Sequence, residues 1–223
     1  MRSAPDELSS TVTLPPRFPG APAVAMVVVC YAGAPGAPVT EADAAIEPLL
    51  ELGTVTEAGI TERPYADVLE EPFRPAGVRP AFRNTMVRDL DEEVFEAVLV
   101  THQAGPPTAV AIRSLGGAFG RVPAEATAFA HRDAEAMVVG MVILPEDADE
   151  AAVTGALRPW RDVAALGSGA YVGFQGSATA EDVSAAYPAA TYARLADVKA
   201  RYDPGNVFAL NHNVAPAGVA SAV

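Results

Sequence analysis

The order of apolar and polar positions along the chain predicts strands interleaved with helices. The valine-rich run over 24–31 is typical of a strand that is buried on both faces. Other apolar or alternating runs predict further strands at 55–63, 82–87, 108–115, 126–131, 136–144 and 169–174. Helical periodicity and helix start signals predict helical segments at 40–53, 64–69, 89–102, 145–166, 180–186 and 190–202, and Pro159 is expected to break the fourth of them.

The predicted strands between 108 and 144 follow one another with short turns, which favours antiparallel pairing. The expected fold class is therefore α+β, with an antiparallel β-sheet covered by helices. Residues 1–20 contain four prolines and no periodic pattern, so we interpret them as an extended arm. A single domain is expected over 21–216, followed by a short tail over 217–223.

Each helix is expected to turn one apolar stripe towards the core. Thr40 is a favourable N-cap for the first helix. Cys30 lies within the valine-rich run and is expected to be a small core residue. The helical side chains expected to face inward are Ile46, Leu49, Leu50, Val94, Phe95, Val98, Leu99, Tyr192, Leu195, Val198 and Tyr202.

The composition narrows the possible partners. Hydrophobic residues make up 50% of the 223 residues and charged residues 19%, as in globular proteins. The net charge of -13 argues against a nucleic-acid surface and against an anionic membrane. The first twenty residues lack the apolar region of a signal peptide, and no apolar run is long enough to cross a bilayer. A soluble, cytoplasmic protein is expected.

No metal site is expected from the sequence. The single cysteine excludes an intrachain disulfide and a thiolate cluster. His102, His131 and His212 lie far apart, and none has a neighbouring ligand at helix or turn spacing. Familiar catalytic motifs are absent as well. The glycine-rich stretch 116–120 is either a hairpin turn or a phosphate cradle, and its strand-like flanks favour the turn.

The stretch that ends near Pro216 has the most specific pattern. A tyrosine-containing helix stops at Asp203-Pro204-Gly205, because proline cannot extend a helix and glycine permits the turn that ends it. Val207-Phe208 follows, and then two asparagines, Asn211 and Asn213. This arrangement resembles the C-terminal signature of the berberine-bridge-enzyme-like flavoprotein oxidases.

Shorter motifs extend the resemblance through the chain, in the order found in the family's substrate-side domain. They are Gly116-Gly117-Ala118, Thr127 to Arg132, Trp160-Arg161 and Tyr171 to Phe174. The resemblance implies an antiparallel sheet, covered by helices, that lies over the reactive face of a flavin. It also implies an upstream domain that holds the FAD, and none of that domain's sequence is present here.

The resemblance also suggests site residues. Tyr171 would reach the pocket, and Tyr171 and Arg132 are the candidate catalytic residues. The family's catalytic base falls at or near Gly140, which cannot take a proton. By period two, Val138, Gly140 and Val142 share one strand face, which would be an apolar wall for a hydrophobic ligand. The alternative is that these three residues pack under a helix.

Three further residues complete the candidate substrate-binding set. Phe174 follows Tyr171 in the same motif, and Asn211 and Asn213 would face a flavin in the family. Without a flavin-binding domain, they would face a substrate, a partner subunit or water. The asparagines alone offer too few hydrogen bonds to hold a dinucleotide.

Two hypotheses for an enzyme follow, and a third for a binding protein. The leading one is a flavin-free, redox-neutral enzyme of secondary-metabolite biosynthesis. It would bind an apolar, polyketide-like intermediate and promote cyclisation, rearrangement or isomerisation, pericyclic reactions included. The alternative is the substrate-binding half of a split or truncated FAD-dependent oxidoreductase. The third is a non-catalytic interface protein. A hydrophobic small molecule is the expected ligand, and a homo-oligomer through an exposed sheet face is expected.

Overall fold

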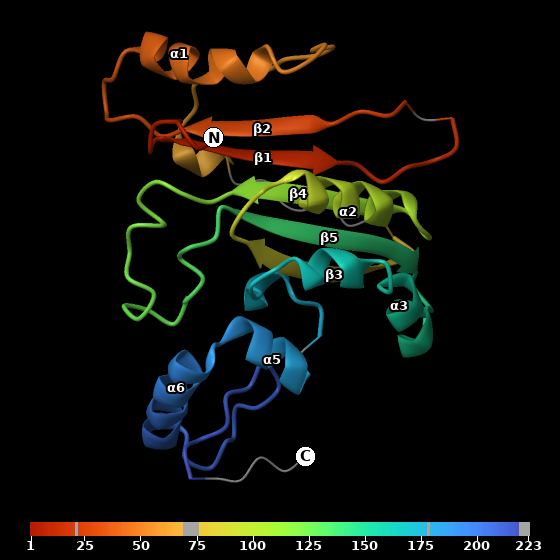
Figure 1. Ribbon diagram of the computed structural model, residues 1–223, viewed down its shortest axis with the longest axis vertical. Coiled ribbons are helices and arrows are strands. Elements are labelled where there is room, and N and C mark those ends of the chain that lie inside the picture. The colour runs from red at the N-terminus through yellow and green to blue at the C-terminus, as the bar shows by residue number, and fades with distance from the viewer. Residues whose placement is uncertain (21, 69–75, 178, 219–223) are drawn as a thin grey trace.

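The computed structural model describes residues 1–20, 22–68, 76–177 and 179–218, and its centre is one antiparallel sheet (Figure 1). The spatial order of the five strands is β2-β1-β4-β5-β3. Their bounds are β1 Leu8–Leu14, β2 Met26–Tyr31, β3 Val78–Val87, β4 Thr108–Ser114 and β5 Ala136–Pro145. The predicted α+β class with an antiparallel, helix-covered sheet is confirmed.

The helical segments are α1 Val39–Leu50, η1 Tyr65–Val68, α2 Glu92–Gln103, α3 Glu150–Ala156, α4 Trp160–Ala165, η2 Val172–Phe174, α5 Ala180–Ala186 and α6 Ala189–Tyr202. Figure 1 places α1 beyond β2 at one end of the sheet, and α5 and α6 beyond β3 at the other. The helix α2 begins where the acidic residues predicted it, because the Asp91 side chain accepts a hydrogen bond from Val94 N. None of the helices in the described ranges is long and apolar enough to cross a membrane.

The two faces of the sheet have different surroundings. On one face, hereafter the helix face, α2 and α4 cover a core that contains Val110, Val138 and Trp160. On the opposite face, hereafter the loop face, Met137 and Val139 of β5 contact side chains from the segments after β4 and after α4. Because successive residues of a strand alternate between faces, odd-numbered residues of β5 belong to the loop face.

The N-terminal third differs most from expectation. Residues 8–14 are not part of a separate arm, because β1 pairs with both β2 and β4 inside the sheet. The valine-rich run is an edge strand rather than a doubly buried one: Met26 is 51% exposed and Val28 56%. Cys30 is exposed as well. The predicted strand at 55–63 is irregular chain.

Two other predicted strands are loops. Residues 126–131 belong to an irregular segment between β4 and β5. Residues 169–174 follow the edge of β3 but form no regular ladder, and end in η2. The predicted break at Pro159 is confirmed, because the helical stretch at 145–166 is two helices, α3 and α4, and Pro159 immediately precedes the second. The end of the predicted turn at 64–69 and of the tail at 217–223 lies outside the described residues.

The helices are in the expected places, but several of their predicted inward residues are not. Thr40 is not the N-cap of α1, which is Pro38. Of the predicted stripes, Ile46, Val94 and Val98 are buried. The predicted inward residues that prove to be exposed are Leu50, Phe95, Leu99, Val198 and Tyr202.

Candidate functional site

An aromatic–arginine cluster lies on the loop face. It consists of Arg113, Phe174, Tyr171, Phe129 and Arg132, which contact one another in that order. The guanidinium carbon of Arg113 lies 4.7 Å from the centre of the Phe174 ring. Ring centres are 6.1 Å apart for Phe174 and Tyr171, and 5.9 Å apart for Tyr171 and Phe129. The guanidinium of Arg132 lies 5.1 Å from the Phe129 ring. Three of the predicted site residues, Tyr171, Phe174 and Arg132, are thus brought together.

Asn84 holds Tyr171 in place. Its side-chain oxygen accepts a hydrogen bond from Tyr171 N at 2.7 Å, and its Nδ2 donates to Tyr171 O at 2.8 Å. Asn84 is only 3% exposed, so these bonds are shielded from water. The side-chain amide therefore replaces part of the ladder that a regular strand would form along the edge of β3. The ring of Tyr171 remains 40% exposed and can meet a ligand.

Arg132 is held by the loop that carries it. Its Nη2 donates to Thr127 Oγ1 at 3.0 Å and its Nη1 to Phe119 O at 3.4 Å. The guanidinium also lies 4.8 Å from the Phe119 ring. Because two of its donors serve the loop itself, Arg132 is suited to positioning Phe129 rather than to a proton-transfer role.

Arg113 is a member of the cluster that the sequence motifs did not indicate. It lies on β4, opposite Met137 of β5 and Thr11 of β1. The signal was present, because an arginine directly after the apolar run 109–112 of a sheet strand is unusual. It went unused because the motifs of the family resemblance do not include that strand.

Val138, Gly140 and Val142 lie on the opposite face from the cluster. Val138 and Val142 are buried beneath helices, in clusters that include Trp160 and Leu157 respectively. A Cβ atom added to Gly140 would lie 2.8 Å from two ring atoms of Trp160. The indole therefore fills the gap at the glycine, and the packing alternative describes these residues, not an apolar ligand wall.

Asn211 and Asn213 lie on the segment that follows α6, apart from the cluster. Asn211 is exposed, whereas the side-chain oxygen of Asn213 is buried without a partner among the described residues. The segment packs back on its own helix, since Ala215 N donates to the Tyr192 hydroxyl at 3.1 Å. The structure therefore groups the asparagines with α6 rather than with Tyr171.

His131 has a structural role in packing the loop against α5. It is buried, and its Nε2 lies 3.2 Å from the carbonyl oxygen of Ala186, at the end of α5. A Cβ atom at Gly169 would lie 2.0 Å from the imidazole, so the ring occupies the space beside that glycine. Burial lowers the pKa of His131, with backbone carbonyls of α5 acting in the opposite direction. The histidine therefore joins the loop to α5.

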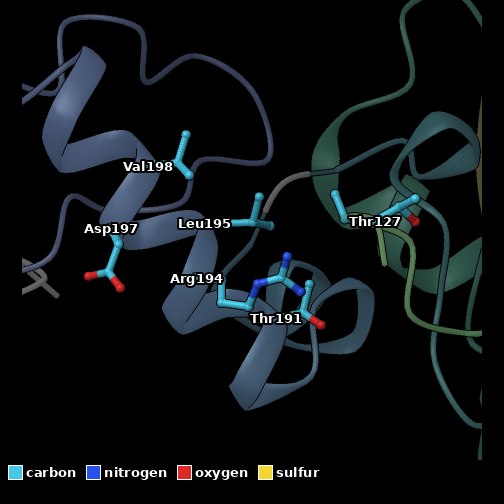
Figure 2. Close-up of a pocket in the computed structure, with 7 residues that line it drawn as sticks. Thr127, Thr191, Arg194, Leu195, Asp197 and Val198 are labelled. Carbon is cyan, nitrogen blue, oxygen red and sulfur yellow. The ribbon is translucent and has the colours of Figure 1, made fainter. Parts of the chain in front are cut away.

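A half-open pocket of about 230 Å³ lies between this loop and α6 (Figure 2). In Figure 2, Leu195 extends from the helix towards Thr127 on the loop. Arg194 donates a hydrogen bond to Glu125 O across the same gap. The complete lining is Thr127, Ala128, Thr191, Arg194, Leu195, Asp197 and Val198. This pocket is small and half open, and none of the predicted site residues lines it, so it is a weaker candidate than the cluster.

The residues of the chain suit the planar ring system of FAD, but the stretch 116–120 does not suit its diphosphate. The aromatic–arginine cluster offers flat rings and N–H donors, which suit one side of a planar ring system. The stretch 116–120 does not suit a diphosphate. A Cβ atom at Gly117 would lie 2.6 Å from the Asp6 carboxylate, which pairs with Arg121, so an anion there would meet a carboxylate. The stretch 116–120 is a local turn, with Phe119 N donating to Gly116 O at 3.1 Å, but it lies in the irregular connection between β4 and β5 and does not join two strands of a hairpin as predicted.

Residues 170–215 match the family described as berberine and berberine-like. This match includes Tyr171 and the C-terminal signature, so the resemblance predicted from the sequence is confirmed. A search of curated proteins finds no match to this chain.

Solved structures of oxidoreductases share the fold of nearly the whole chain. Aclacinomycin oxidoreductase superposes with a TM-score of 0.70 at 22% identity, over 94% of this chain and 47% of its own. 6-Hydroxy-D-nicotine oxidase from Arthrobacter nicotinovorans gives 0.69 at 22%, over 94% and 48%. A glycopeptide hexose oxidase complexed with teicoplanin gives 0.71 at 23%, over 96% and 49%. The chain therefore spans about half the length of these proteins.

Proposed function

We propose that this chain is the substrate-binding part of an FAD-linked oxidoreductase and acts together with a flavin-binding domain. The observation that carries the proposal is the asymmetry of the sheet. Helices fill the helix face, whereas the loop face presents an aromatic–arginine cluster with a half-exposed tyrosine. The length of the solved structures supports it, because about half of each is a part that this sequence does not contain.

In this proposal the chain's own residues bind and orient the substrate. The rings of Phe174 and Tyr171 form an apolar surface for it, and the Tyr171 hydroxyl donates a hydrogen bond to a substrate oxygen. Met137 and Val139, beneath the cluster, keep water from the sheet side of the site. Bound FAD would supply the two-electron acceptor that the chain itself lacks.

The flavin-binding domain is the partner that best accounts for the exposed apolar positions. Met26 and Val28 alternate on the loop-face side of the edge strand β2, and both are more than half exposed. A sheet face of this kind is normally covered. Analytical ultracentrifugation tests whether a flavin-binding domain or a second copy of the chain covers this face. A complex with a flavin-binding polypeptide is expected, whereas a stable homodimer of this chain alone would support the predicted homo-oligomer.

A redox-neutral, flavin-free enzyme is the second candidate. It is favoured by the loop-face side of β5, where Met137, Val139 and Met141 provide no group that can take a proton. Cyclisation, rearrangement or isomerisation of a secondary-metabolite intermediate needs chiefly a restricted conformer, which contributes up to about 7–11 kcal/mol in intramolecular reactions. A colourless native enzyme that turns over such an intermediate would favour this candidate.

Tyr171→Phe tests the role given to the phenol in both candidates. Removing one preorganised donor from a reacting oxygen typically costs about 10²–10³ in kcat, and the half-exposed position of Tyr171 favours the lower end. Tyr202→Phe is the matched control, because Tyr202 is exposed on α6. Equal rates for the two variants would reduce Tyr171 to a packing residue.

A further inference from the structure

Arg113 and Arg132 each have a guanidinium Nε that is buried without a hydrogen-bond partner among the described residues. Arg132 still donates hydrogen bonds through both Nη atoms, whereas the Arg113 guanidinium lies over the Phe174 ring. A buried N–H without an acceptor leaves its desolvation uncompensated, and native proteins seldom keep such a group without a reason. Arginine remains charged at any physiological pH, so it cannot escape this cost by losing a proton.

Other arginines of the molecule pair with carboxylates at the surface. These pairs include Arg2 with Glu135, Arg88 with Asp133, and Arg121 with Asp6. Arg113 has none of these partners in the described part of the chain, and the arginine contacts an aromatic ring instead. The cation is therefore available to an anion that comes from outside the chain.

The neighbours of Arg113 favour a flat, apolar ligand body beside that anion. The guanidinium lies over Phe174, whose ring is followed by Tyr171 and then Phe129. On the sheet beneath, the cross-strand neighbour of Arg113 is Met137, a soft apolar side chain. A planar guanidinium presents two parallel N–H donors, which match the two oxygens of a carboxylate.

We propose that Arg113 binds the carboxylate of an aromatic substrate, whose ring lies against Phe174 and Tyr171. This assignment rests on the proposed function, because it names the substrate class of the same face. The chain as a whole has a net charge of -13 and would repel such an anion, so the local positive group selects where it binds.

The proposal is tested by direct binding of two probes to the full chain. The fluorescent anion 2-naphthoate and its neutral analogue 2-naphthamide have similar shapes and differ in charge. Titration should show that the naphthoate binds about 10- to 100-fold more tightly, as a charge-assisted pair predicts. Equal affinities, or no measurable binding of the naphthoate, would overturn the proposal.

Substitutions locate the source of the preference. In Arg113→Gln the two probes should bind within about twofold of each other, whereas Arg161→Gln, an exposed arginine on α4, should retain the full preference. A preference that survives in Arg113→Gln would refute the assignment. If that variant does not fold, Arg113→Lys replaces it. This variant should retain only part of the preference, because lysine lacks the two parallel N–H donors of the guanidinium.

These titrations need no flavin and no partner. If the chain binds naphthoate selectively but its native assembly contains no flavin, the oxidoreductase proposal is wrong and the carboxylate-binding role of Arg113 stands. If the assembly contains flavin but the chain does not prefer naphthoate, the role of Arg113 is wrong and the oxidoreductase proposal stands.

Discussion

Gly140→Ala tests whether this position belongs to the packed core. The added Cβ would lie 2.8 Å from Cε3 and Cζ3 of Trp160, closer than carbon atoms normally approach. Trp160 is almost fully buried beside Val138 and Val163, so the indole has little room to move. Overpacking of this kind costs about 1–3 kcal/mol, and removing a strand glycine returns about 0.5–1 kcal/mol. The expected net loss is about 0–2.5 kcal/mol of unfolding free energy.

Chemical denaturation monitored by tryptophan fluorescence measures this loss, since the chain has one tryptophan. The matched control is Gly155→Ala in α3, where a Cβ would meet nothing within 4 Å. That variant should gain up to about 1 kcal/mol, because alanine favours the helix. If Gly140→Ala is as stable as Gly155→Ala, Gly140 borders open space, and the packing described for the helix face is incorrect.

Three further perturbations test the surroundings of the site. Asn84→Ala should cost about 2–5 kcal/mol of unfolding free energy and shift the NMR signals of Tyr171, because buried amide bonds to its backbone are lost. Burial lowers the pKa of His131 in the folded state, so its contribution to the free energy of unfolding should be fully present above about pH 6.5 and should be lost as the pH drops. In acid denaturation, the stability of His131→Gln should therefore fall less steeply with pH than that of the unchanged protein. Lys199→Met removes the ion pair with Asp203, at 2.5 Å, and should speed amide hydrogen exchange in the loop after α6; unchanged exchange would mean that this pair does not hold the loop.

Periodicity predicted which residues of β5 share a face, but it could not show where that face points. Val138, Gly140 and Val142 do lie on one side, yet it is the side that Trp160 covers. The direction depends on where a helix more than fifteen residues away packs. A two-residue repeat is equally compatible with either assignment, and the family resemblance led to the wrong one.

The sequence also could not show that β2 is an exposed edge strand, or that a side-chain amide takes the place of strand pairing beside β3. The valine content of β2 predicts a strand correctly, but hydrophobicity does not show whether the covering surface belongs to the same chain. The 169–174 stretch is apolar enough for a strand, but Asn84 replaces its backbone partners. The helices α2 and α6 were predictable because Asp91 and the Asp203-Pro204-Gly205 stop act locally.

The flavin content of the native assembly is the most direct test of the proposed function. The chain should be isolated with its partners from the cells that produce it, and the FAD released on denaturation should be counted against the chain. The account predicts about one FAD per chain, carried by a flavin-binding domain on a partner or on a longer form of the polypeptide. An active assembly that is colourless and free of FAD would contradict it.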